Sequence, residues 1–115
     1  MRVDFPDGQW AEIYSVGEMP RRVTVRMQEM LAEIPEDQPG YAYGRDMGRL
    51  RDTLMAMVVK QWSYEFERTG SAEDTYDLPQ DSYDALRDAT RVHWEKAGFT
   101  EAEKEETPSE TTSSA

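Results

Sequence analysis

A helical repeat of apolar residues between about Arg45 and Phe66 is the feature that most constrains the fold of this chain. Apolar residues spaced three and four apart line one side of an α-helix. Residues 54–59 (LMAMVV) are apolar on nearly every side, and such a helix has to be surrounded by other elements. The sequence therefore predicts a long helix at the centre of the fold. The repeat consists of Met47, Leu50, Leu54, Met57, Val58, Trp62 and Phe66.

An amphipathic helix is predicted before it, over about residues 20–34. Pro20 suits the first turn of a helix, where its missing N–H costs nothing, and Pro35 ends the pattern. Residues 35–44 (PEDQPGYAYG) hold two prolines and two glycines, so we expect a loop there. The apolar side of this helix consists of Val23, Met27, Met30, Leu31 and Ile34.

A β-hairpin is predicted at the N-terminus. Val3 and Phe5 lead into the turn sequence at residues 6–8 (PDG), and residues 10–14 are rich in strand-forming side chains. Two short strands are only marginally stable in water, so the hairpin has to pack on a helix.

A third helix is predicted after the acidic loop that follows residues 69–71. Asp81 or Ser82 is expected to cap this helix by accepting an N–H from its first turn. Gly98 suits the left-handed position after the last turn, and Phe99 can pack back onto the helix. Its apolar side consists of Tyr83, Leu86, Thr90 and Trp94.

The segment from Thr100 onward holds five glutamates, one lysine and no large apolar residue. It cannot bury enough surface to offset the entropy of ordering it. The predicted fold is therefore mainly α: a short N-terminal β-hairpin packed on a three-helix core, followed by a disordered acidic tail. Residues 1–99 are expected to form one small domain, which either has modest stability or is helped by a partner or by self-association, and residues 100–115 to form the tail.

The net charge is −11, with 24 acidic residues against 13 basic. This charge repels phosphate backbones and anionic lipids, which argues against nucleic-acid and membrane partners. It favours basic partners, although solubility alone explains it equally well. The chain has no cysteine, which excludes disulfides and thiolate sites, and no apolar run approaches the roughly 18 residues of a membrane span. The N-terminus lacks an apolar signal region, so we expect a cytoplasmic location.

No residue set in the sequence indicates catalysis. His93 is the one histidine, and a packed or surface role suits it better than a catalytic one. Glu73, Asp74 and Asp77 lack the ligand pattern of a calcium loop, so a solvated acidic loop is expected there. The chain is therefore predicted to be a non-enzyme without catalytic residues, cofactor or metal. Six arginines near the first two helices are expected to form a polar face with local ion pairs: Arg21, Arg22, Arg26, Arg45, Arg49 and Arg51.

The chain has seven methionines, and six lie in or beside the first two helices. Methionine fills cores, but it is also common on surfaces that accept varied apolar helices. If Met19, Met27 or Met55 lies outside the core, it marks a groove for a partner helix. The predicted partner-binding residues are Met19, Met27, Met55 and Trp62.

Three short segments carry a resemblance to a known family. They are residues 5–13 (FPDGQWAEI), the pair Trp62–Ser63, and Leu78-Pro79 followed by residues 83–86 (YDAL). Over about residues 3–95 the chain resembles small tail assembly chaperone-like proteins of actinobacterial bacteriophages and prophages.

The resemblance implies a protein that coats helical segments of a phage tape-measure protein, or another tail protein, in the host cytoplasm and is absent from the finished particle. The alternative is a structural virion subunit of the tail or the head–tail junction. A third hypothesis, an acidic inhibitor that mimics nucleic acid, is disfavoured by the arginine cluster. Stoichiometric presence in purified particles would distinguish the virion subunit.

Overall fold

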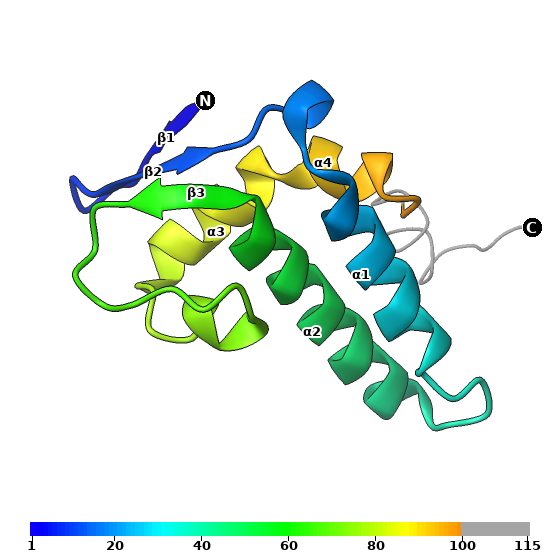
Figure 1. Ribbon diagram of the computed structural model, residues 1–115. Coiled ribbons are helices and arrows are strands. Elements are labelled where there is room, and N and C mark those ends of the chain that lie inside the picture. Colours follow the sequence, from blue (N-terminus) through cyan, green and yellow to red (C-terminus); the bar gives the residue numbers. More distant parts are fainter. Residues whose placement is uncertain (100–115) are drawn as a thin grey trace, which may run out of the picture.

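The computed structural model describes residues 1–99, which form four α-helices, two short 3-10 helices and one three-stranded antiparallel sheet (Figure 1). The predicted tail, residues 100–115, lies outside the described residues. The elements in chain order are β1 (Arg2–Asp4), β2 (Trp10–Ile13), η1 (Val16–Glu18), α1 (Arg21–Ala32), α2 (Gly40–Val58), β3 (Val59–Trp62), η2 (Ala72–Thr75), α3 (Gln80–Ala89) and α4 (Arg91–Lys96).

The predicted hairpin is confirmed. β1 and β2 pair antiparallel, with Val3 opposite Ala11. The turn between them needs a residue with positive φ, and Gly8 supplies it at 89°. The amide of Gly8 donates to the carbonyl of Phe5 at 3.0 Å, which closes the turn.

The predicted helix over residues 45–66 is wrong at its C-terminal end, because α2 stops at Val58 and the chain continues as β3. β2 would otherwise have an open edge, and β3 covers that edge by pairing Ala11 with Trp62 and Ile13 with Val59. β-Branched and aromatic side chains favour this pleated edge. The sheet therefore has three strands rather than the two of a hairpin.

The start of α2 also differs from the prediction, because the helix begins at Gly40 inside the expected loop. Pro39 stands at the N-cap, and its carbonyl accepts the amides of Ala42 and Tyr43 at 3.0 and 3.1 Å. Ala42 is buried, so tertiary packing holds this first turn despite the glycines within it.

The predicted third helix is two helices, α3 and α4, joined at Thr90. The buried Thr90 hydroxyl donates to the carbonyl of Leu86 at 2.8 Å, a contact that commonly bends helices. The expected capping by Asp81 or Ser82 is wrong, since α3 begins directly after Pro79 without a side-chain cap.

The end of α4 is confirmed as predicted. Gly98 has φ of 110°, in the left-handed region. Phe99 turns back and stacks on Trp94, with ring centroids 4.0 Å apart and planes inclined by 14°. This stacking closes the C-terminal end of the described domain.

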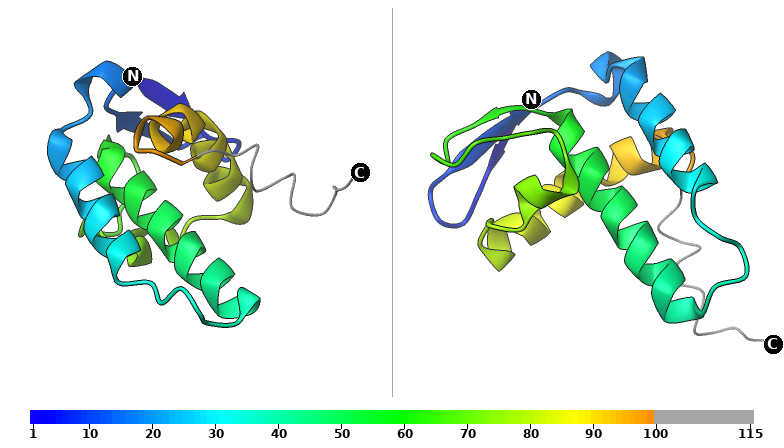
Figure 2. Two further views of the ribbon diagram at one scale, coloured as in Figure 1. Left: turned by 90° about the vertical axis from the view of Figure 1, so that its right-hand side faces the viewer. Right: turned by 60° about the horizontal axis from the view of Figure 1, so that its bottom comes forward.

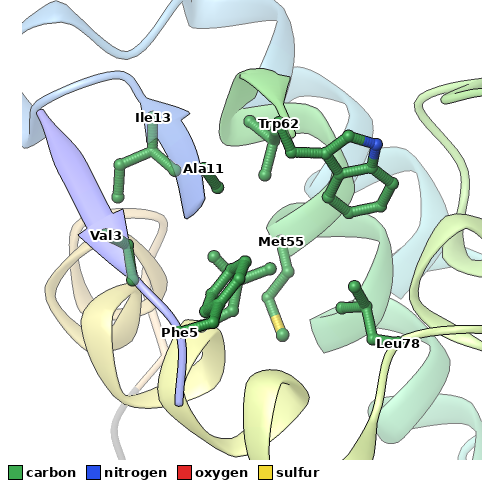
Figure 3. Packing of buried hydrophobic residues seen from close by; sticks show 9 residues of the cluster. Val3, Phe5, Ala11, Ile13, Met55, Trp62 and Leu78 are labelled. Atoms are coloured by element: carbon green, nitrogen blue, oxygen red, sulfur yellow. The ribbon is translucent and has the colours of Figure 1, made fainter. Parts of the chain in front are cut away.

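The core consists of two clusters, and α2 contributes to both, which confirms its predicted central place (Figures 1 and 2). The first lies between the sheet, the end of α2 and α3 (Figure 3). The second lies between α1, α2 and α4. The first cluster consists of Val3, Phe5, Ala11, Ile13, Met55, Val59, Trp62, Leu78 and Leu86, and the second of Val23, Met27, Leu50, Leu54, Val58, Trp94 and Ala97.

Candidate partner-binding surface

The four predicted partner-binding residues do not form one surface. Met27 and Met55 are fully buried, and they belong to different core clusters. Trp62 is 9% exposed and packs in the first cluster with Met55. Only Met19 is partly exposed, where it packs against the second cluster. Burial therefore removes Met27, Met55 and Trp62 as partner contacts of the folded domain.

Trp62 lies in the first cluster (Figure 3), and two aromatic neighbours hold its ring there. Its ring meets Tyr64 and Phe66 edge-on, at centroid distances of 5.7 and 5.1 Å. Its indole N–H donates to the carbonyl of Phe66 at 3.3 Å. Such edge-to-face pairs stabilise beyond simple area burial, so the role of Trp62 is structural.

The second cluster runs out to solvent at one end of the α1–α2 pair. Met27 and Leu50 are fully buried, whereas Met30 and Met47, about one helical turn further along, are only partly buried. One more turn along α2, Tyr43 is 45% exposed. We call this the hairpin-end surface, and it consists of Met30, Leu31, Ile34, Tyr43 and Met47.

Antiparallel packing brings the α1 and α2 residues of this surface to the same end of the helix pair, where Met30, Leu31 and Met47 pack against the second cluster. α1 and α2 lie side by side, and the connection over residues 33–39 joins their adjacent ends (Figures 1 and 2). The side chain of Gln38 donates to Oδ2 of Asp46 at 3.0 Å and ties this connection to α2. The hairpin-end surface is therefore built on two helices and anchored at its loop.

His93 is a packed histidine, as the sequence favours. It is fully buried on α4, and its Nε2 lies 2.7 Å from the carbonyl oxygen of Tyr14. This contact joins α4 to the segment that follows β2. The ring is therefore engaged in holding two elements together.

The acidic loop is not the solvated loop that the sequence predicts, because Asp74 is buried. Its carboxylate accepts the amides of Thr69 and Gly70 at 2.7–2.9 Å and the Thr69 hydroxyl at 2.8 Å. Asp74 thus folds the loop back on itself. In the part of the chain that the structure describes, no group of histidine, cysteine and acidic residues has the arrangement of a metal site.

The predicted ion pairs are confirmed for Arg26, Arg45 and Arg49. Arg26 pairs with Glu29 at 3.7 Å, and Arg49 pairs with Glu73 at 3.2 Å. Arg51 differs from the other arginines because it is buried. Its guanidinium carbon lies 5.0 Å from the ring centroid of Trp94. The other five arginines are exposed on α1 and α2, as expected of a charged helix surface.

Among residues 1–99, no helix is long and apolar enough to cross a membrane.

Comparison with known proteins does not assign this chain to a family. A scan against known protein families and searches of curated proteins and of solved structures find no significant match for this chain. Sequence reasoning missed Tyr43 and did not separate Met30 and Met47 from the other methionines. The available signal was position: all three lie within a few turns of the loop that joins the two helices.

Proposed function

We propose that this chain is a non-catalytic binding protein whose hairpin-end surface accepts the apolar face of a partner helix. The supporting observation is the core cluster between α1 and α2, which continues without a break from buried Met27 and Leu50 to partly exposed Met30 and Met47. An apolar row that ends in solvent gains free energy when a partner covers it.

The residue types on this surface suit a helical partner. Methionine side chains are flexible and polarisable, so they adapt to different apolar partners. Tyr43 offers an apolar ring with a polar tip, a combination common at interfaces. The net charge of −11 would keep a complex in solution and favour basic partner segments.

The biological role that we propose is that of a bacteriophage tail assembly chaperone, acting on a tape-measure protein in the host cytoplasm. It rests on the resemblance described above and on a surface suited to apolar helices. The engagement of His93 with the Tyr14 carbonyl supports a structural rather than a catalytic role for that residue.

Co-expression tests the role. The long helical protein encoded beside this gene should be insoluble alone and soluble together with this chain. A Met47→Glu variant should lose that effect, and an exposed-site control, Tyr76→Glu, should keep it. Presence at fixed copy number in purified particles would replace the chaperone role by that of a structural virion subunit.

A further inference from the structure

Negative charge is in excess around the connection between α1 and α2. From residue 26 to residue 47 the chain has five carboxylates and two arginines. Arg26 pairs with Glu29 at 3.7 Å. Arg45 pairs with Asp46 at 3.4 Å. Because these two pairs are neutral, the three other carboxylates set the charge at this end of the helix pair.

Those three carboxylates form an acidic rim, which consists of Glu33, Glu36 and Asp37. All three residues are exposed, and within residues 1–99 none of them takes part in an ion pair. Ile34 of the hairpin-end surface lies between Glu33 and Glu36 in the chain. The acidic rim therefore adjoins the apolar surface on its loop side, and its charges are available to a ligand.

Two exposed tyrosines follow the same connection. Tyr41 and Tyr43 lie in the first turn of α2, where they are 80% and 45% exposed. The face of an aromatic ring attracts an ammonium or guanidinium group. The tyrosine rings and the acidic rim therefore favour the same kind of ligand group, a cationic side chain.

We propose that the partner of the hairpin-end surface is a basic amphipathic helix. Its apolar side covers Met30, Tyr43 and Met47, and its lysines or arginines contact the acidic rim. This inference rests on the proposed function and adds the charge of the partner and the place where that charge is recognised. Complementary charge at the edge of an interface mainly raises the association rate and selects among partners. An acidic helix with the same apolar side is therefore expected to be a poor ligand.

Fluorescence anisotropy with two labelled synthetic peptides tests this on the full chain. One peptide is an amphipathic helix whose leucine side is flanked by lysines, and the other has glutamates in place of those lysines. The chain should bind the lysine peptide about tenfold more tightly, because only that peptide complements the acidic rim. Salt at about 0.5 M should narrow the difference, since it screens exposed charges.

Neutralising the acidic rim tests where the charge is recognised. The triple variant Glu33→Gln/Glu36→Gln/Asp37→Asn should bind the lysine peptide about fivefold to tenfold more weakly than wild type. The effect is moderate because each exposed ion pair contributes little by itself. Binding of the glutamate peptide should not weaken.

The matched control removes the same charge from exposed positions outside α1 and α2, with Glu65→Gln, Glu67→Gln and Asp77→Asn. This control should bind the lysine peptide within about twofold of wild type, because distant exposed charges are screened. Equal weakening in the two triple variants, equal Kd values for the two peptides, or no binding of the lysine peptide would overturn the inference.

A further variant distinguishes this failure from failure of the proposed function. Tyr43→Ser/Met47→Ser should weaken the binding of both peptides, because it removes apolar contacts that do not depend on charge. Wild-type affinity in that variant would contradict the hairpin-end surface itself.

Discussion

The hydroxyl of Tyr83 on α3 donates a hydrogen bond of 2.6 Å to Oδ1 of Asp52 on α2. Burial raises the pKa of Tyr83 to about 12, and the hydrogen bond to the Asp52 carboxylate adds to this. Burial also raises the pKa of Asp52, although Tyr83 opposes that shift. The pair therefore joins α3 to the central helix through two groups that both lie partly out of water.

The pH dependence of the Tyr83–Asp52 pair gives the first prediction. The folded protein holds the Tyr83 proton up to about pH 12, whereas an unfolded chain releases it near 10. The contribution of Tyr83 to stability is therefore complete below pH 10 and is lost as the pH rises through 12. The difference in absorbance at 295 nm between wild type and Tyr83→Phe should show one tyrosinate forming near pH 12. A difference titration centred at 10 would contradict the coupling.

Removing the large aromatic residue of the first cluster should be severely destabilising. Trp62→Ala leaves a cavity beneath Tyr64 and Phe66 and should lower the free energy of unfolding by about 3–5 kcal/mol. Urea denaturation measures this, with partly exposed Trp10→Ala as the control expected to lose less. Equal losses would show that Trp62 does not carry core packing.

Replacing the buried Asp74 should lower stability much more than replacing the exposed Asp77 of the same loop. Asp74→Ala leaves the amides of Thr69 and Gly70 without their acceptor and should lower stability by about 3 kcal/mol. Asp77→Ala, at an exposed position, should stay within about 0.5 kcal/mol of wild type. Thermal unfolding at pH 7 distinguishes them, and similar midpoints for the two variants would refute the assigned role of Asp74.

His93 should matter for stability and not for function. His93→Ala removes a fully buried ring and its contact with the Tyr14 carbonyl, which should lower stability by about 2–4 kcal/mol. Below the unfolding temperature of the variant, partner binding should match wild type. The exposed neighbour Val92→Ala serves as the control for both measurements. A folded His93→Ala protein without function would contradict a purely structural histidine.

The sequence predicts elements well where local chemistry decides them. α1 ends near Pro35, and the left-handed Gly98 lies where the C-terminal pattern places it. The sequence-based prediction fails at residues 59–62. Val58, Trp62 and Phe66 continue the helical spacing, while residues 59–62 themselves also suit a strand. The open edge of β2 decides between the two, and that edge exists only in the folded molecule.

The candidate surface is harder to predict for a related reason. Met27 and Met30 belong to the same apolar repeat of α1, and nothing in their spacing separates them. Their burial differs because Met27 lies within the second cluster, whereas Met30 lies about one turn nearer the end of the helix pair and only packs against that cluster. Tertiary position, and not residue type, therefore selects the exposed methionine.

The affinity of this chain for a helical fragment of its partner tests the central claim most directly. Fluorescence anisotropy of a labelled fragment would compare wild type with Tyr43→Ser/Met47→Ser and with the control Tyr76→Ser, whose tyrosine is 59% exposed outside the hairpin-end surface. Loss of two interface anchors at about 1 kcal/mol or more each predicts at least a tenfold weaker Kd for the double variant. The control should bind as wild type does. Wild-type affinity in the double variant, or an equal loss in Tyr76→Ser, would contradict the hairpin-end surface as the binding site.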